Sequence, residues 1–226
     1  MNSRGTIPAV RRIVALLIAF ALAAGAGASV AVRASVEDLT EASRVVAEGV
    51  VTDHTVTLDR AAGVIWTEHR LRVGRMLAGA ATKEITVRVR GGSVGTIVQE
   101  VIGAPKLEDG ERVVLFLGAE EHGAREIVGL AQGAFEVETD PKTGATFCRN
   151  SIDGLSLVDA TGGDAAPEAL RLPLEDLAAR VTATTEKIEA RRKAAREALD
   201  RRLAAWRRAA ERHMELTRGK PGGAAL

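Results

Sequence analysis

The sequence contains little cysteine and few aromatic residues. Cys148 is the only cysteine among 226 residues, and there are four Phe, two Trp and no Tyr. A single cysteine excludes an intrachain disulfide and a metal site built from several thiolates. Because Cys148 stands between Phe147 and Arg149 and next to no histidine, we expect a small hydrophobic strand residue rather than a reactive thiol. A disulfide between two chains stays open.

The sequence also lacks an overall excess of charge, because 31 Lys and Arg stand against 30 Asp and Glu. This balance is the sum of three different segments. Residues 1–34 carry four Arg and no acid, residues 35–173 carry 14 bases and 22 acids, and residues 174–226 carry 13 bases and 8 acids. Nucleic-acid-binding barrels use basic grooves and aromatic platforms. The acidic middle segment therefore excludes nucleic acid as a partner and confines polyanion binding to the C-terminal segment.

No apolar run is long enough to span a bilayer comfortably. Only Ile13–Ala24 is strongly apolar, which is shorter than the roughly 20 residues that a transmembrane helix needs. Arginines precede this run and small residues follow it, as in a secretory signal peptide. We therefore expect residues 1–34 to be a signal that is cleaved after Ala34, or after an earlier Ala-Gly-Ala triplet near Ala26 and Ala28. The mature protein would be periplasmic or secreted, and an uncleaved N-terminal membrane anchor is the alternative.

Residues 35–158 are expected to form an antiparallel β-barrel domain. Ser35, followed by Glu37 and Asp38, predicts a short helix at its start. From Ser43 onward, β-branched residues alternate with period two between turn residues, which indicates strands. The predicted strands are 44–57, 63–77, 84–90, 96–102, 111–118, 124–130, 133–139 and 145–149.

Many short strands without alternating long helices favour a sandwich or a small closed barrel over a parallel α/β fold. The strand at 84–90 alternates apolar and polar residues and should be half-buried, whereas Val113–Leu117 is apolar on both faces and should be central. Two long first strands, with room to bend at Gly49 or Gly74, favour a barrel of the OB type. The expected class is mainly β, α+β overall, with a short N-terminal and a long C-terminal helix.

The glycine and turn positions of this segment resemble a known family. They are Val46-Ala-Glu-Gly49-Val, Trp66-Thr67, Gly91-Gly92, Gly103-Ala-Pro105, Gly110-Glu111 with the following Val-Leu-Phe-Leu, and Gly129-Leu-Ala-Gln132-Gly133-Ala-Phe135. Residues 36–150 are similar to an uncharacterised family of exported bacterial proteins whose barrel resembles the OB-like netrin modules of tissue inhibitors of metalloproteinases. The resemblance implies structural roles for Gly91, Gly92, Gly103, Pro105, Gly110, Glu111, Gly129, Gln132 and Gly133. Netrin-type inhibitors depend on an N-terminal Cys that this sequence lacks, so their activity does not carry over.

No catalytic or metal-binding motif is recognisable. The four histidines, His54, His69, His122 and His213, stand in no His-x-x-x-His frame, so neither a metal nor a cofactor is expected. Alternation places His69 on the buried face of its strand, where a hydrogen-bonded core histidine is the first expectation and a functional acid or base the second. No serine stands in Gly-x-Ser-x-Gly or Ser-x-x-Lys.

The C-terminal segment is a separate element. Residues 159–173 are expected to be a linker, 174–218 an amphipathic basic helix in one or two segments, and 219–226 a flexible tail. The apolar stripe weakens at 182–185 and 191–193, which predicts a short docked helix followed by an exposed one of about 25 to 30 residues.

Three roles are open for the long helix. These are self-association as a coiled coil, a solvated helix held by charge pairs such as Glu197 with Arg201, and adsorption to an anionic envelope surface. The basic residues that would make surface contacts are Arg191, Arg192, Lys193, Arg196, Arg201, Arg202, Arg207, Arg208 and Arg212.

The expected function is that of an exported, non-enzymatic binding or interaction module of the cell envelope or extracellular space. Its partner would be an unidentified protein or envelope component. One alternative is a secreted hydrolase whose site gathers dispersed residues such as His69, and another is an inhibitor of a secreted protease, by analogy of fold alone. A deep cavity holding His69 and a carboxylate would favour the hydrolase, whereas a filled barrel interior would favour the binding module.

Overall fold

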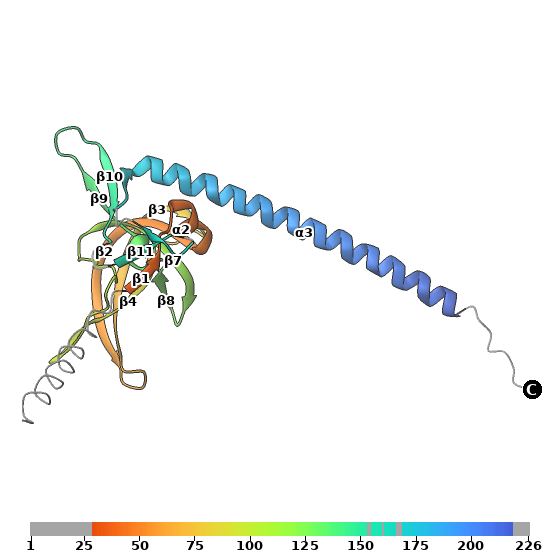
Figure 1. Cartoon of the computed structure of the whole chain (residues 1–226), viewed down its shortest axis with the longest axis horizontal. Helices are drawn as coiled ribbons and strands as arrows, with labels where there is room; N and C mark the ends of the chain where they lie inside the picture. Colours follow the sequence, from red (N-terminus) through yellow and green to blue (C-terminus); the bar gives the residue numbers. More distant parts are fainter. Residues whose placement is uncertain (1–28, 153–154, 160, 166–168, 219–226) are drawn as a thin grey trace, which may run out of the picture.

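The structure is mainly β, with one long C-terminal helix. The computed structural model describes residues 29–152, 155–159, 161–165 and 169–218. The part that precedes residue 174, here called the head, is rich in strands, and α3 (Leu174–Arg218) extends far beyond it (Figure 1). The expected α+β class, mainly β with a short and a long helix, is confirmed. The expected signal core and the tail at 219–226 lie outside the described residues.

A mixed sheet of eight strands forms most of the head. The strand order is β13-β10-β9-β7-β2-β3-β4-β8, and β8 pairs with β7 as well as with β4. The β4–β8 pairing is parallel and the other pairings of this sheet are antiparallel. The strands are β2 Val45–Asp59, β3 Val64–Ala78, β4 Glu84–Arg90, β7 Arg112–Glu121, β8 Ala124–Ile127, β9 Ala134–Thr139, β10 Thr146–Asn150 and β13 Arg171–Pro173.

Short strands complete the head, and several of them differ from the sequence prediction. β5 (Gly92–Val94) and β6 (Ile97–Gln99) form a hairpin, so the strand predicted at 96–102 is shorter and lies outside the large sheet. β11 (Leu155–Val158) pairs with β12 (Asp164–Ala165) and, in parallel, with β1 (Ser29–Val32). The predicted linker at 159–173 therefore contains β12 and β13, and the predicted signal overlaps with a strand of the head.

The central strand β7 is buried on both of its faces. Val113, Leu115 and Leu117 point to one side and pack in a cluster with buried residues of β2, β3 and β4. Val114 and Phe116 point to the other side, where they pack against α2, α3 and β9. The prediction that this segment is central is confirmed, because residues of a strand alternate between faces and here both faces are covered.

β2 and β3 form a long hairpin that bends near Gly49. The register between the two strands shifts between Glu48 and Gly49. A Cβ atom at Gly49 would lie 2.4 Å from the carbonyl oxygen of Arg72 on β3, which is closer than two such atoms can approach. The absence of a side chain at Gly49 therefore lets the two backbones meet at the bend.

The short helix α2 (Val36–Ala42) begins as the sequence predicts. The Ser35 hydroxyl accepts a hydrogen bond from the Asp38 backbone N–H, and the Asp38 carboxylate accepts one from the Ser35 backbone N–H. This reciprocal pair is a capping box. Val36 and Leu39 are buried against the outer face of the sheet, so the cap fixes where the helix begins and its apolar side fixes where it docks.

The helix α3 is continuous over its 45 residues, so the predicted break between two helices is wrong. At 182–185, the hydroxyls of Thr182 and Thr185 donate to the carbonyl oxygens of Ala178 and Val181, one turn earlier. These bonds satisfy the hydroxyl groups within the helix, so the weak part of the apolar stripe does not leave polar side chains without partners. The predicted division into a docked start and an exposed remainder is nevertheless found.

The first turns of α3 dock on the head through apolar and ionic contacts. Leu174, Leu177 and Val181 are buried in the cluster that contains α2 and Phe116. Arg180 donates to both carboxylate oxygens of Glu37, at 2.9 and 2.6 Å, and this interaction lowers the pKa of Glu37 to about 2. No helix among the described residues combines the length and apolarity needed to cross a membrane.

Leu177→Ala should lower the free energy of unfolding by about 3 kcal/mol, because it leaves a cavity in the cluster beneath α3. Urea denaturation followed by circular dichroism measures the change. Leu203→Ala is the matched control, since it removes the same atoms from the same helix at a side chain that is 46% exposed. We expect the control to cost less than about 0.5 kcal/mol. Equal losses in the two variants would contradict the docking of the first turns.

Candidate functional site

Two histidines of neighbouring strands lie opposite each other in the β2–β3 hairpin. His54 and His69 are direct partners in the antiparallel register. Side chains of directly opposed residues lie on the same face of a sheet, and the centroids of these two imidazole rings are 5.6 Å apart. The hairpin thus brings together two histidines that are distant in sequence.

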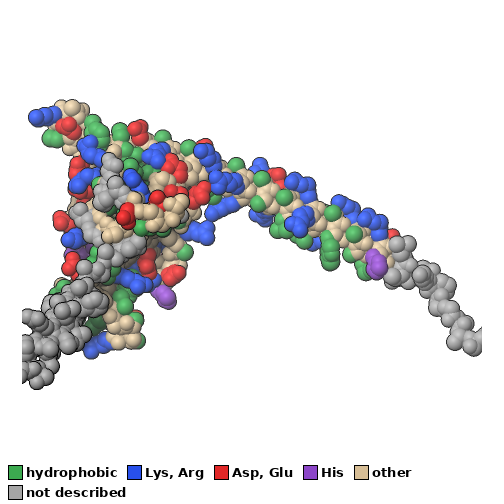
Figure 2. Space-filling model, in the orientation of Figure 1, with side chains coloured by type: hydrophobic (Ala, Val, Ile, Leu, Met, Phe, Trp, Pro, Cys, Tyr) green, Lys and Arg blue, Asp and Glu red, His purple; other side chains and the backbone are tan. Residues whose placement is uncertain are grey.

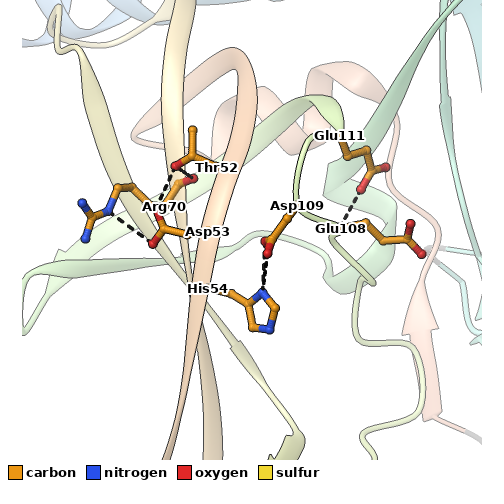
Figure 3. A network of polar contacts seen from close by, with 7 residues as sticks. All are labelled: Thr52, Asp53, His54, Arg70, Glu108, Asp109 and Glu111. Carbon is orange, nitrogen blue, oxygen red and sulfur yellow. Dashed lines mark hydrogen bonds and ion pairs between the residues drawn. The ribbon is translucent and has the colours of Figure 1, made fainter.

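A carboxylate from the loop before β7 completes this group. Asp109 places its two carboxylate oxygens 3.0 and 3.1 Å from Nδ1 of His54 (Figure 3). The loop is fastened to β2 beside His54, because the Gly110 N–H donates to the Val51 carbonyl and the Val51 N–H donates to the Glu111 carbonyl. The backbone therefore fixes where Asp109 stands relative to His54.

His69 is buried and lacks a partner at one ring nitrogen. Its exposed fraction is 5%, which confirms the prediction that it lies on the buried face. Among the described residues, no group hydrogen-bonds to its Nδ1. The expectation of a hydrogen-bonded core histidine is therefore not met at this atom. Burial, and then the nearby His54, lower the pKa of His69, while Asp109 opposes them. Burial and His54 therefore both favour the neutral form of the His69 ring.

His54 and His69 line a cavity of about 350 Å³. Its wall includes side chains of β3, of β4 and of the loop before β7, among them Thr67, Arg90 and Lys106. One donor atom from each of His54, His69 and Asp109 lies within 4.8 Å of the other two. Two imidazoles and a carboxylate at this separation can exchange protons or coordinate a metal ion.

The cavity offers no activated nucleophile among the residues that the structure describes. Ser93 lines it, but no hydrogen bond joins its hydroxyl to either histidine, and the Thr67 hydroxyl donates to the Gly91 carbonyl instead. Nucleophilic catalysis requires a hydroxyl or thiol within reach of its base. The site thus lacks the arrangement of a serine or threonine hydrolase.

The pairing of His54 with His69 could have been predicted from their equal distances to the hairpin turn, a relation that short metal-binding motifs do not include. The hairpin turn lies between Asp59 and Val64, and His54 and His69 stand five residues before and five after these strand ends. Residues at equal distance from a hairpin turn pair across it. The place of Asp109 could not have been predicted in this way, because it depends on long-range contacts of the loop at 108–111.

The motif residues taken from the family resemblance divide between four places. Gly91, Gly92 and Pro105 line the histidine cavity, and Gly103, Pro105 and Glu111 line a second cavity of about 480 Å³. Gly110 belongs to the loop that carries Asp109. Gly129, Gln132 and Gly133 lie in and before the 3-10 helix η2 (Leu130–Gly133).

The second cavity contains charged groups but no cluster like that of the histidines. Burial raises the pKa of Glu111, whose carboxylate accepts a hydrogen bond from the Glu108 N–H (Figure 3). Arg149 pairs with Glu136 on the same wall. Gly103 stands at the edge with φ +78°, and a Cβ atom there would lie 2.1 Å from Leu155, so this position requires glycine.

Gln132 fixes the N-terminal segment to the head. Its side chain is 3% exposed; Oε1 accepts from the Ala34 N–H at 2.9 Å and Nε2 donates to the Val32 carbonyl at 3.1 Å. The Arg33 N–H donates to the Val158 carbonyl. A buried amide needs such partners, so the role of Gln132 is structural.

The basic residues predicted to make surface contacts are exposed along α3. Two of them have partners: Arg191 pairs with Glu41 of α2 at 3.1 Å, and Arg201 lies 4.0 Å from Glu197. Figure 2 shows basic and hydrophobic side chains together along the projecting helix. The exposed hydrophobic residues are Leu199, Leu203, Trp206 and Met214.

Cys148 lies in β10 and is fully buried, as the sequence predicts for a small hydrophobic residue. Its thiol donates weakly to the Leu172 carbonyl at 3.4 Å. Burial raises the pKa of this thiol to about 11. Because the thiolate is the reactive form, the folded protein should protect Cys148 from alkylation.

We therefore expect native protein at pH 8 to resist modification by a thiol-specific reagent and to release one reactive thiol in guanidinium. Ala205→Cys is the positive control, because it places a thiol on the exposed part of α3 and should react at once. Mass spectrometry counts the modified residues. Rapid labelling of native Cys148, or a disulfide-linked dimer on a nonreducing gel, would contradict the burial.

Comparison with known proteins adds no relative to this description: no protein-family model matches the chain, and no curated protein matches it significantly.

Proposed function

We propose that the protein is an exported, non-enzymatic interaction module whose head holds α3 as an arm for contact with an anionic component of the cell envelope. The observation that carries this proposal is the exposed part of α3, where an apolar stripe is bordered by arginines. The partner is defined by its chemistry: a negatively charged surface with an apolar layer beneath, such as anionic lipid.

The geometry of the stripe supports an interfacial role. At about 100° per residue, Leu199, Leu203, Trp206 and Met214 fall within an arc of about 80°. Arg196, Arg202 and Arg207 border this arc on its two sides. A helix that lies on a membrane surface buries its apolar face while basic residues contact the headgroups.

Self-association as a coiled coil is less well supported. If Leu203 and Trp206 occupied a and d positions, then Arg196 would fall at a, and Arg192 and His213 at d. These side chains would have to enter the seam between two helices, with like charges facing each other. Repulsion between these charges disfavours the pairing of two identical helices, whether parallel or antiparallel. An anionic partner would instead be attracted by the same arginines.

We further propose that the head is an OB-like barrel. The pairings that support this are β2 with β3, β3 with β4, β4 in parallel with β8, β8 with β7, and β7 with β2. They join five strands in a ring, and the OB fold is a five-stranded, partly open barrel. The apolar cluster on the inner side of β7 fills the space within this ring, which favours a binding module over an enzyme.

Hydrolysis is the alternative function, and one observation favours it: His54 and His69 line a cavity, and a donor atom of Asp109 lies within 4.8 Å of those of both histidines. The filled interior places this cavity at the surface of the head, and the described site lacks a nucleophile. A test with hydrolysable ester and phosphoester substrates distinguishes the two functions, because the interaction module should show no turnover.

Export requires that a signal be removed without loss of β1. We propose cleavage upstream of Ser29, because a cut after Ala34 would remove all of β1, the strand that pairs with β11. It would also remove the Ala34 N–H and the Val32 carbonyl, which are the hydrogen-bond partners of the buried Gln132 side-chain amide. The triplets Ala-Gly-Ala that end at 26 and 28 satisfy the small-residue requirement of signal cleavage.

Intact-mass analysis of secreted or periplasmic protein should therefore give a chain that begins at or shortly before Ser29. As a control, a chain that starts at Ser35 should unfold at a lower temperature than one that starts at Ser29. A natural N-terminus at Ser35 would contradict the assignment, and retention of the full chain in the membrane would favour the uncleaved anchor.

Binding to vesicles tests the role of α3. Replacing Arg196, Arg202 and Arg207 by Gln should weaken binding to vesicles rich in phosphatidylglycerol by on the order of 100-fold, since each basic residue near an anionic surface contributes about 1 kcal/mol. Vesicle sedimentation at low and high salt measures the effect, and binding should weaken with salt.

The matched control replaces Arg201, Arg208 and Arg212, which lie on the opposite face of α3, and removes the same number of charges. We expect it to weaken binding much less than the bordering triple. Equal effects of the two triples would indicate unspecific electrostatic attraction, and no binding by the unmodified protein would reject the anionic surface as partner.

A further inference from the structure

We propose that His54, His69 and Asp109 form a binding site for one divalent transition-metal ion, with Zn²⁺ as the ion that fits best. The juxtaposition that carries the proposal is the donor group at the β2–β3 hairpin, where one donor atom of each residue lies within 4.8 Å of the other two. This site is independent of α3 and of the proposed contact with an anionic surface.

The buried imidazole is the second observation that points to a ligand. Only 5% of the surface of His69 is exposed, and its Nδ1 has no hydrogen-bond partner among the described residues. An unpaired polar atom inside a protein costs free energy. Coordination of a metal ion by the His69 ring would give this buried imidazole a polar partner.

The donor set determines the class of metal. Imidazole nitrogens suit zinc, copper, nickel and iron, whereas calcium and magnesium prefer sites made only of oxygen. Two histidines and one carboxylate are the protein ligands of an open zinc site, in which solvent or an external ligand takes the fourth position. The cavity of about 350 Å³ beside His54 and His69 leaves room for that fourth ligand.

The distance between the donor atoms of His54 and Asp109 is close to that of a tetrahedral site, and the donor atoms of the group all lie within 4.8 Å of one another. Bonds of about 2.1 Å at tetrahedral angles place neighbouring donor atoms about 3.4 Å apart. Nδ1 of His54 lies 3.0 and 3.1 Å from the Asp109 oxygens, so this edge already has nearly the required length. The side chains of His54 and Asp109 are 46% and 44% exposed, so both can rotate toward the fixed ring of His69.

The backbone around the three ligands is held in place. His54 and His69 are paired in the β2–β3 ladder, and the loop of Asp109 is joined to β2 by the two hydrogen bonds between Val51 and residues 110 and 111. Metal binding therefore needs side-chain rotation rather than refolding. A site whose ligands are preorganised on strands binds with a smaller loss of conformational entropy.

Isothermal titration calorimetry of the metal-free, full-length protein with Zn²⁺ tests the proposal. We expect one ion per chain with a dissociation constant in the micromolar range or below. His54→Gln and Asp109→Asn should each weaken binding by on the order of 100-fold, because each removes a direct ligand from the site. His213→Gln is the matched control, since it removes a histidine at the far end of α3 and should leave binding unchanged.

Two further measurements keep the result interpretable. Co²⁺ in place of Zn²⁺ should give the intense visible absorption of a tetrahedral site, and this band should be lost in Asp109→Asn. Zn²⁺ should raise the melting temperature of the unmodified protein but not that of His54→Gln. The folded state of each variant is checked by circular dichroism, and both substituted side chains are exposed enough to change without loss of the fold.

No binding of Zn²⁺ by the unmodified protein would overturn the proposal. Undiminished binding by both His54→Gln and Asp109→Asn would also overturn it, because the ion would then lie elsewhere. A loss of binding in His213→Gln equal to that in His54→Gln would have the same consequence. None of these outcomes depends on whether the arginines of α3 bind an anionic surface.

Discussion

Burial of β7 on both of its faces is the constraint on which the rest of the structure depends. Leu115 and Phe116 are adjacent in sequence and point in opposite directions, yet both are fully buried. One face is covered by β3 and β4, whose Leu71 and Val87 belong to the same cluster as Leu115. Since β4 lies three places from β7 in the strand order, the sheet has to bend strongly for these residues to meet. The other face requires cover from α2 and α3.

The bend also determines where the metal-binding candidates stand. Because the sheet bends, the half of the β2–β3 hairpin that contains the turn lies beside the loop that precedes β7. His54 and His69 lie in that half, and Asp109 lies in the loop, so three residues of no common motif converge at the edge of the filled core. The packing that buries the apolar cluster beside β7 thus leaves a small polar group near its edge.

The sequence was sufficient for features that depend on local periodicity and capping. The strands of the large sheet other than β13, the central position of Val113–Leu117, the cap at Ser35 and the burial of His69 and Cys148 follow from alternation and from hydrogen-bonding capacity. The features that escaped it depend on tertiary contacts. Short strands such as β1 and β13 carry too few residues for a period, and Asp109 reaches His54 only through folding.

Ion pairs join the root of α3 to the head, and the outer part of the helix lies beyond the reach of the acids of the head. Arg75 with Glu175, Arg180 with Glu37, and Arg191 with Glu41 join the first five turns of the helix to the head. Among the described residues, the Arg191 pair is the outermost of these contacts. Beyond it the helix extends for about 40 Å at about 1.5 Å per residue, which is several Debye lengths at physiological salt. The acids of the head are therefore too far away to neutralise the arginines around Trp206, so the negative charge that opposes them comes from acids of the helix itself, such as Glu197 beside Arg201, or from a partner.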